Sequence, residues 1–113
     1  MDKIKKYQDI LVEYLEDYAK TVKPKNLPDV DAYVIADRKN NHFQFLRIGW
    51  QGQYHVFSAI LHFDIKNGKV WVQQNNTERD VVDVFMEKGI PKEDIVMGFH
   101  PPNVRKYTEF AEG

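Results

Sequence analysis

The chain has 113 residues, 42% of them hydrophobic and 29% charged, which suits one domain with a packed core and leaves no room for a second. Its 16 basic and 17 acidic residues give a net charge of −1, which argues against a protein that coats nucleic acid through a basic surface. It has no cysteine, which excludes disulfides and thiol chemistry, and no apolar run long enough to cross a membrane. We therefore expect a single soluble, cytoplasmic domain over residues 1–113.

The first predicted element is an amphipathic helix over residues 2–21. Its apolar residues recur at steps of three and four, with charged residues on the opposite side. Asp2 can cap the first turn, and Pro24 with Pro28 ends the helix because proline cannot continue the hydrogen-bond ladder.

The middle of the chain alternates apolar and polar residues and is rich in β-branched and aromatic side chains. Four strands are predicted near residues 30–37, 42–50, 54–65 and 69–75. Asn67-Gly68 is the clearest turn, because a type I′ turn needs positive φ at both central residues. A second tight turn is expected at Gln51-Gly52, so the sheet is predicted to be an antiparallel meander.

Two helices are predicted after the strands. The first covers residues 77–88 with Thr77 as its N-cap, and the second covers residues 102–110 and begins at a pair of prolines. A brief apolar segment, residues 95–99, lies between them. The predicted fold is α+β with two layers, in the order α-β-β-β-β-α-α, with the helices on one face of the four-stranded sheet.

The two turns predict which side chains share a face of the sheet. The core face is expected to hold Leu46, Phe57, Ala59, Leu61, Phe63, Ile65, Val70 and Val72. The other face is expected to mix apolar and ionisable side chains, with His62 opposite Gln73: Phe43, Phe45, Arg47, Val56, Ile60, His62, Asp64, Trp71 and Gln73. An apolar patch with a polar border is typical of an interface, so we predict that a second chain covers this face. The alternative is that the C-terminal segment folds across it.

One pair of residues suggests chemistry. His62 and Asp64 point to the same side of one strand, so they could form a His-carboxylate pair or two ligands of a metal site. No third ligand is evident, because the other three histidines are scattered along the chain. We therefore predict a structural role for His62 and assign no catalytic residue, metal or cofactor. The alternative is a ligand-binding or catalytic pocket in which His62, Asp64 and Arg105 converge.

Four separated blocks point to a family. They are Leu61–Gln73, Thr77-Glu78, Gly89–Phe99, and Pro101-Pro102 followed by Arg105–Ala111. In this order they resemble the XisI-like family of fdxN element excision controlling factors over nearly the whole chain. Beyond the predicted interface, the positions that match the family motif are Thr77, Glu78, Arg105, Tyr107 and Thr108.

The resemblance implies a small cyanobacterial protein that acts in heterocyst differentiation. Such a protein works with an XisH-like companion, beside a site-specific recombinase, in the excision of a DNA element. It is a controlling or accessory factor and not an enzyme. We accordingly expect a homodimer or a complex with the companion, and neither a membrane nor nucleic acid as a direct partner.

Overall fold

The computed structural model describes residues 2–21 and 29–113. Its elements are α1 (Lys3–Thr21), β1 (Val30–Asp37), β2 (His42–Gln51), β3 (Tyr54–Lys66), β4 (Lys69–Asn75), α2 (Val81–Glu87), the 3-10 turn η1 (Lys92–Asp94), β5 (Ile95–Val96) and α3 (Pro102–Arg105). The five strands form one sheet in chain order, and all neighbours are antiparallel except β4 and β5. Within the described residues, no helix has the length and apolar character needed to span a membrane.

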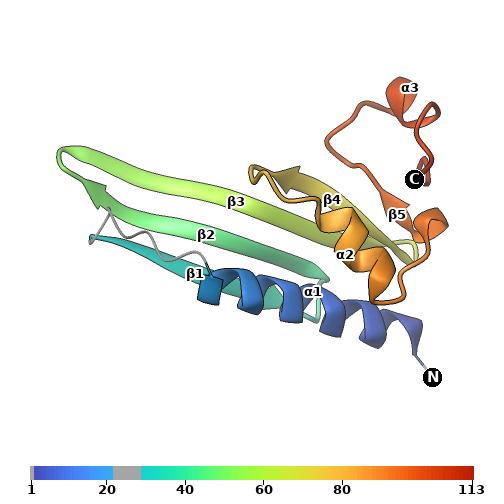
Figure 1. Ribbon diagram of the computed structural model, residues 1–113, viewed down its shortest axis with the longest axis horizontal. Helices are drawn as coiled ribbons and strands as arrows, with labels where there is room; N and C mark the ends of the chain where they lie inside the picture. Colours follow the sequence, from blue (N-terminus) through green and yellow to red (C-terminus); the bar gives the residue numbers. More distant parts are fainter. Residues whose placement is uncertain (1, 22–28) are drawn as a thin grey trace.

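The α1 and α2 helices cover one face of the sheet, which we call the inner face, and the opposite side is the outer face. Figure 1 shows α1 running beside the strands, α2 close to β4, and α3 apart from both near the C-terminus. Tyr18 of α1 packs edge-to-face on Phe45 with ring centroids 5.0 Å apart, and Phe85 of α2 packs on Phe63 at 5.1 Å. Aromatic pairs of this geometry stabilise the fold by more than the burial of their apolar area alone. The core therefore lies between the helices and the inner face.

The α+β class and the four predicted strands are confirmed, but the predicted four-stranded sheet was incomplete. A fifth strand, β5, runs parallel to β4 and pairs Ile95 with Val70 and Val96 with Trp71. It lies in the apolar segment 95–99, for which no strand was predicted. Two residues are too few to show the period of a strand, and both are fully buried by tertiary contacts.

The helix boundaries differ in part from the prediction. Asp2 caps α1, because its Oδ1 accepts a hydrogen bond from the Ile4 amide at 2.9 Å. Asp80 caps α2 instead of Thr77, and it accepts from the amides of Val82 and Asp83 at 3.1 and 3.3 Å. The α3 helix ends at Arg105, five residues before the predicted end. The predicted end of the first helix at Pro24 and Pro28 lies outside the described residues.

A β-bulge between β2 and β3 overturns part of the predicted face assignment. Leu46 pairs with Ala59, but Phe45 pairs with Leu61, so Ile60 is an extra residue in β3. Because side chains alternate between the two faces, one extra residue exchanges the faces beyond it. A face assignment that starts at the Asn67-Gly68 turn and continues along β3 without the bulge is therefore wrong for the residues beyond Ile60.

The bulge divides the predicted interface in two. Phe43, Phe45, Arg47, Val56 and Ile60 fall on the inner side, whereas His62, Asp64, Trp71 and Gln73 lie on the outer face as predicted. Phe43 and Phe45 are fully buried core residues. Leu46, Phe57 and Ala59 were expected on the core face and lie on the outer face. The turn also differs, because Gln51 pairs with Tyr54 and leaves Gly52-Gln53 as the connection.

Candidate functional site

Three ionisable side chains meet on the outer face, and we call them the histidine cluster: His42, His62 and Asp64. His42 begins β2 and pairs with Asp64 of β3, while His62 precedes Asp64 by two residues on the same strand. Nδ1 of His42 and Nε2 of His62 each lie 2.7 Å from Oδ1 of Asp64. One carboxylate oxygen therefore serves two imidazole rings.

Asp64 is the one charged side chain that is buried in the part of the chain that the structure describes, with 8% of its surface exposed. Burial acts to raise the pKa of its carboxyl. The hydrogen bonds and positive charges of His42 and His62 outweigh burial and hold the pKa below its ordinary value of 3.8. Nε2 of Gln73 donates to Oδ2 at 3.3 Å, so both oxygens of this carboxylate have partners.

Gln44 supports the cluster from the neighbouring strand. Its Oε1 lies 3.2 Å from Nδ1 of His62, so in this orientation Nδ1 of His62 carries the proton. The His42 side chain is 55% exposed and that of His62 is 26% exposed. Solvent therefore reaches the cluster from the side of His42, while His62 and Asp64 are held within the sheet.

The sequence pointed to His62 and Asp64 but not to His42. The Gly52-Gln53 turn and the bulge at Ile60 together set the register that places His42 opposite Asp64, and tertiary packing determines where a bulge forms. A second irregularity makes Gln73 an extra residue in β4, so His62 pairs with Gln74 and not with Gln73 as predicted. Gln73 nevertheless reaches Asp64. The sequence signal for His42 was only its place at the start of a strand that pairs with the strand of Asp64.

Trp71 is covered by the chain's own C-terminal segment. The Arg105 guanidinium lies 5.0 Å from its ring centroid and the Lys66 ammonium lies 4.2 Å from it, both in cation–π range. A Cβ built on Gly113 would approach the indole ring to 3.3 Å. Trp71 is only 8% exposed as a result. At this end of the outer face, the chain's own C-terminal segment therefore covers part of the predicted interface.

The other predicted motif residues make local contacts. Nε of Arg105 donates to the His100 carbonyl at 2.8 Å, and Thr108 Oγ1 donates to the Arg105 carbonyl at 2.8 Å. Thr77 donates to Oδ1 of Asn75, while Glu78 and Tyr107 are exposed. Within residues 2–21 and 29–113, Arg105 forms no hydrogen bond or ion pair with His62 or Asp64. The predicted pocket of these three residues is therefore not assembled by direct contacts.

Exposed apolar side chains gather on the outer face of β1, β2 and β3. We call this group the hairpin patch: the exposed Tyr33, Ile35, Trp50 and Phe57, together with the partly buried Ile48. The register places all five on the outer face, around the buried side chain of Leu46. Trp50 is 54% exposed and Phe57 is 68% exposed. The apolar surface predicted for this face is thus present, but it consists of other residues.

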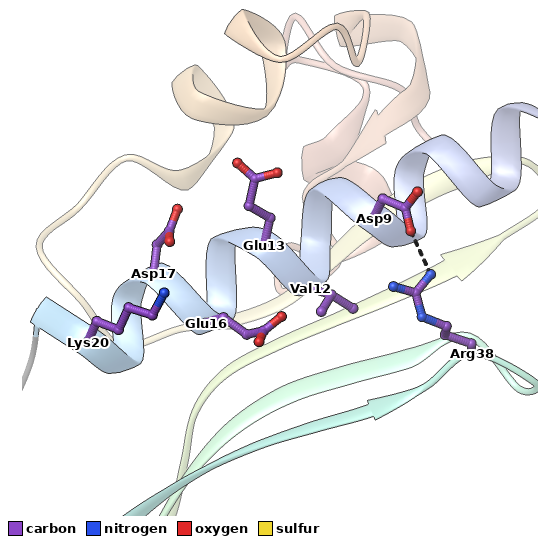
Figure 2. A pocket seen from close by; sticks show the side chains of 7 residues that line it. All are labelled: Asp9, Val12, Glu13, Glu16, Asp17, Lys20 and Arg38. Atoms are coloured by element: carbon purple, nitrogen blue, oxygen red, sulfur yellow. Dashed lines mark hydrogen bonds and ion pairs between the residues drawn. The ribbon is translucent and has the colours of Figure 1, made fainter.

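A groove along α1 lies on the other side of the molecule. Figure 2 shows Asp9, Glu13, Glu16 and Asp17 around it, with Asp9 bonded to Arg38. The Arg38–Asp9 distance is 2.8 Å, and Lys88 pairs with Glu13 at the same distance. These partly exposed ion pairs neutralise much of the acidic charge, and such pairs are ordinary features of a solvated helix face.

Comparisons with known proteins agree with one another. The family model XisI protein matches residues 1–112. A crystal structure of a XisI-like protein from Anabaena variabilis ATCC 29413 is 38% identical, superposes with a TM-score of 0.90, and the match covers 96% of this chain and 97% of that one. A crystal structure of the fdxN element excision controlling factor XisI from the same organism is 35% identical with a TM-score of 0.87, covering 99% of this chain and 100% of that one. A search of curated proteins finds no match.

Proposed function

Because this chain belongs to the XisI family, we propose that it is a controlling factor for the excision of a DNA element. The similarity to an fdxN element excision controlling factor over 99% of this chain supports this role. We place its action in the cytoplasm of a cyanobacterium during heterocyst differentiation. Cleavage and rejoining of DNA belong in this proposal to a separate site-specific recombinase, and this chain acts as a non-enzymatic accessory through protein contacts.

The hairpin patch carries the proposal. Trp50 and Phe57 are large aromatic side chains that are more than half exposed, and Tyr33 and Ile35 extend the same surface onto β1. Contiguous exposed apolar surface of this kind is typical of protein interfaces, and aromatic residues are the usual anchors of binding energy. The net charge of −1 is also better suited to a protein partner than to direct DNA binding.

We propose that an XisH-like companion covers the hairpin patch. A second copy of this chain is the competing occupant. Among the described strands β1 is at the edge of the sheet, and a free edge can pair with a strand of either partner, so it does not distinguish between them. The companion is preferred because an accessory factor of the recombinase needs a surface that is free for a different protein. A homodimer through the patch would bury that surface before the companion could bind.

The experiment is co-expression of this chain with the XisH-like companion, followed by light-scattering measurement of the mass of the purified complex. Wild-type protein is expected to form a stable heteromeric complex. Trp50→Ala and Phe57→Ala should each weaken it by about 2 kcal/mol, as expected for aromatic anchors. Tyr107→Ala is the matched control, because Tyr107 is 81% exposed but lies in the C-terminal segment.

The result of this experiment distinguishes the XisH-like companion from a second copy of this chain as the partner at the hairpin patch. A heteromeric complex that is lost in Trp50→Ala but kept in Tyr107→Ala supports the proposal. A stable homodimer that ignores the companion would assign the patch to self-association. Loss of binding in the Tyr107 variant alone would move the interface to the C-terminal segment and overturn the role of the hairpin patch.

A further inference from the structure

We propose that the histidine cluster is a binding site for one divalent transition-metal ion, with Zn²⁺ the best suited. Two imidazoles and one carboxylate form a donor set that such ions prefer. The potential ligand atoms of His42, His62 and Asp64 all lie within 4.8 Å of one another. This inference is independent of the hairpin patch and of the proposed role in excision.

The separations fit an ion after small side-chain rotations. Zn²⁺ binds nitrogen and oxygen ligands at about 2.0–2.2 Å, so ligand atoms around a tetrahedral ion lie roughly 3.3 Å apart. The two nitrogen-to-oxygen distances of 2.7 Å would have to open by about half an ångström. Rotation of the half-exposed His42 ring opens one of these distances, and a small rotation of the Asp64 carboxylate opens the other, without displacing either strand.

The surrounding side chains match the support that metal-binding histidines usually have. Nδ1 of His62 donates to Gln44, so Nε2 is the ring atom that can bind a metal, once the ion takes the place of the proton that lies between Nε2 and Asp64 in the metal-free protein. A lone pair facing a carboxylate oxygen at 2.7 Å is repulsive unless a proton or a cation lies between them. Gln73 holds the other carboxylate oxygen at 3.3 Å and fixes the orientation of Asp64.

The backbone holds the ligands in place. His42 and Asp64 are paired residues of adjacent antiparallel strands, and His62 lies on the same face of β3 as Asp64. Hydrogen-bonded strands keep the Cα positions fixed, so a metal would not have to order a loop on binding. Two nitrogens and one oxygen disfavour Mg²⁺ and Ca²⁺, which prefer oxygen ligands throughout. The exposure of His42 leaves a fourth position for water.

The test starts from full-length protein that has been stripped with a chelator and then dialysed against Zn²⁺. Wild-type protein is expected to hold one Zn²⁺ per chain by atomic absorption. His42→Ala and His62→Ala should each raise the dissociation constant at least tenfold. His55→Ala and His100→Ala are matched controls, because these are the two other histidines of the sequence and neither belongs to the cluster.

A spectroscopic measurement identifies the ligands. Co²⁺ in place of Zn²⁺ should give visible absorption of a low-coordinate site in wild-type protein and not in the His42 or His62 variants. Circular dichroism shows whether each variant is folded, and Asp64→Asn is added because it preserves the shape of the buried side chain. Substoichiometric Zn²⁺, or equal affinity in folded His42→Ala and wild-type protein, would overturn the proposal. Displacement of the bound Zn²⁺ by Mg²⁺ at the same concentration would also contradict the proposal.

Discussion

Tyr7 and Asp94 are 87 residues apart in the chain, and the Tyr7 hydroxyl donates to Oδ2 of Asp94 at 2.5 Å. Lys3 lies 3.2 Å from the same oxygen. Burial and the hydrogen bond to Asp94 raise the pKa of Tyr7, so its hydroxyl stays protonated. Burial opposes ionisation of Asp94, but the bonds from Tyr7 and Lys3 hold the pKa of Asp94 below its ordinary value. This contact joins α1 to the turn that leads into β5.

Tyr7→Phe should therefore lower the free energy of unfolding by about 1–2 kcal/mol, because it removes a hydrogen bond to a charged group and keeps the ring. Urea unfolding monitored by circular dichroism measures the change. Tyr107→Phe serves as the control, since Tyr107 is 81% exposed and should show no difference. An equal effect in the two variants would mean that the Tyr7 hydroxyl contributes nothing specific.

Phe45 and Phe57 test the bulge. Phe45 is fully buried beneath Tyr18, so Phe45→Ala should cost about 3–5 kcal/mol of stability. Phe57 is 68% exposed on the outer face, so Phe57→Ala should change the stability of the isolated chain by less than about 0.5 kcal/mol. The face assignment made without the bulge requires the opposite order, and urea unfolding of the two variants decides between them.

Arg105 is expected to hold the C-terminal segment over Trp71. Arg105→Ala should shift the fluorescence of Trp71 to longer wavelength and cost about 1 kcal/mol, because the cation–π contact and the hydrogen bond to the His100 carbonyl are lost. The measurement uses a Trp50→Phe background, so that Trp71 is the one remaining tryptophan. Lys106→Ala is the neighbouring control and should leave the spectrum unchanged. An unchanged spectrum in Arg105→Ala would show that other contacts cover the ring.

Asp64 should make the free energy of unfolding depend on pH in the acidic range. Its pKa is lower in the folded than in the unfolded chain, so the unfolded chain takes up the proton first as pH falls. The contribution of Asp64 is fully present above the unfolded pKa of about 4 and is lost as pH falls through the folded pKa. Between pH 5 and 2, metal-free wild-type protein should thus lose more stability than Asp64→Asn.

Urea titrations at several pH values measure this difference. The pKa values of Asp9, Asp37 and Asp94 are also lowered, but these groups are common to both proteins, so their contributions cancel in the comparison. Parallel stability profiles for the wild type and Asp64→Asn would contradict the role of the two histidines in holding the carboxylate charged.

Local signals in the sequence determined much of the fold. The spacing of apolar residues predicted α1, and the alternation predicted β1 and β4 with the bounds that the structure has. Asn67 and Gly68 have φ values of 54° and 74°, and the pairs nearest this turn, such as Ile65 with Val70, are as predicted. Turn chemistry and periodicity act within a few residues, so no distant contact is needed to infer them.

Only the tertiary structure decided which side chains meet across the sheet. The bulge leaves Ile60 without a partner in β2. The shifted register that results lets Phe43 and Phe45 pack beneath α1. The same shift places His42 against Asp64. The alternation of residue types in the sequence of β3 shows no break at Ile60, so the position of the bulge depends on contacts with a helix far away in sequence. The placement of β5 and of the C-terminal cover on Trp71 depends on long-range packing for the same reason.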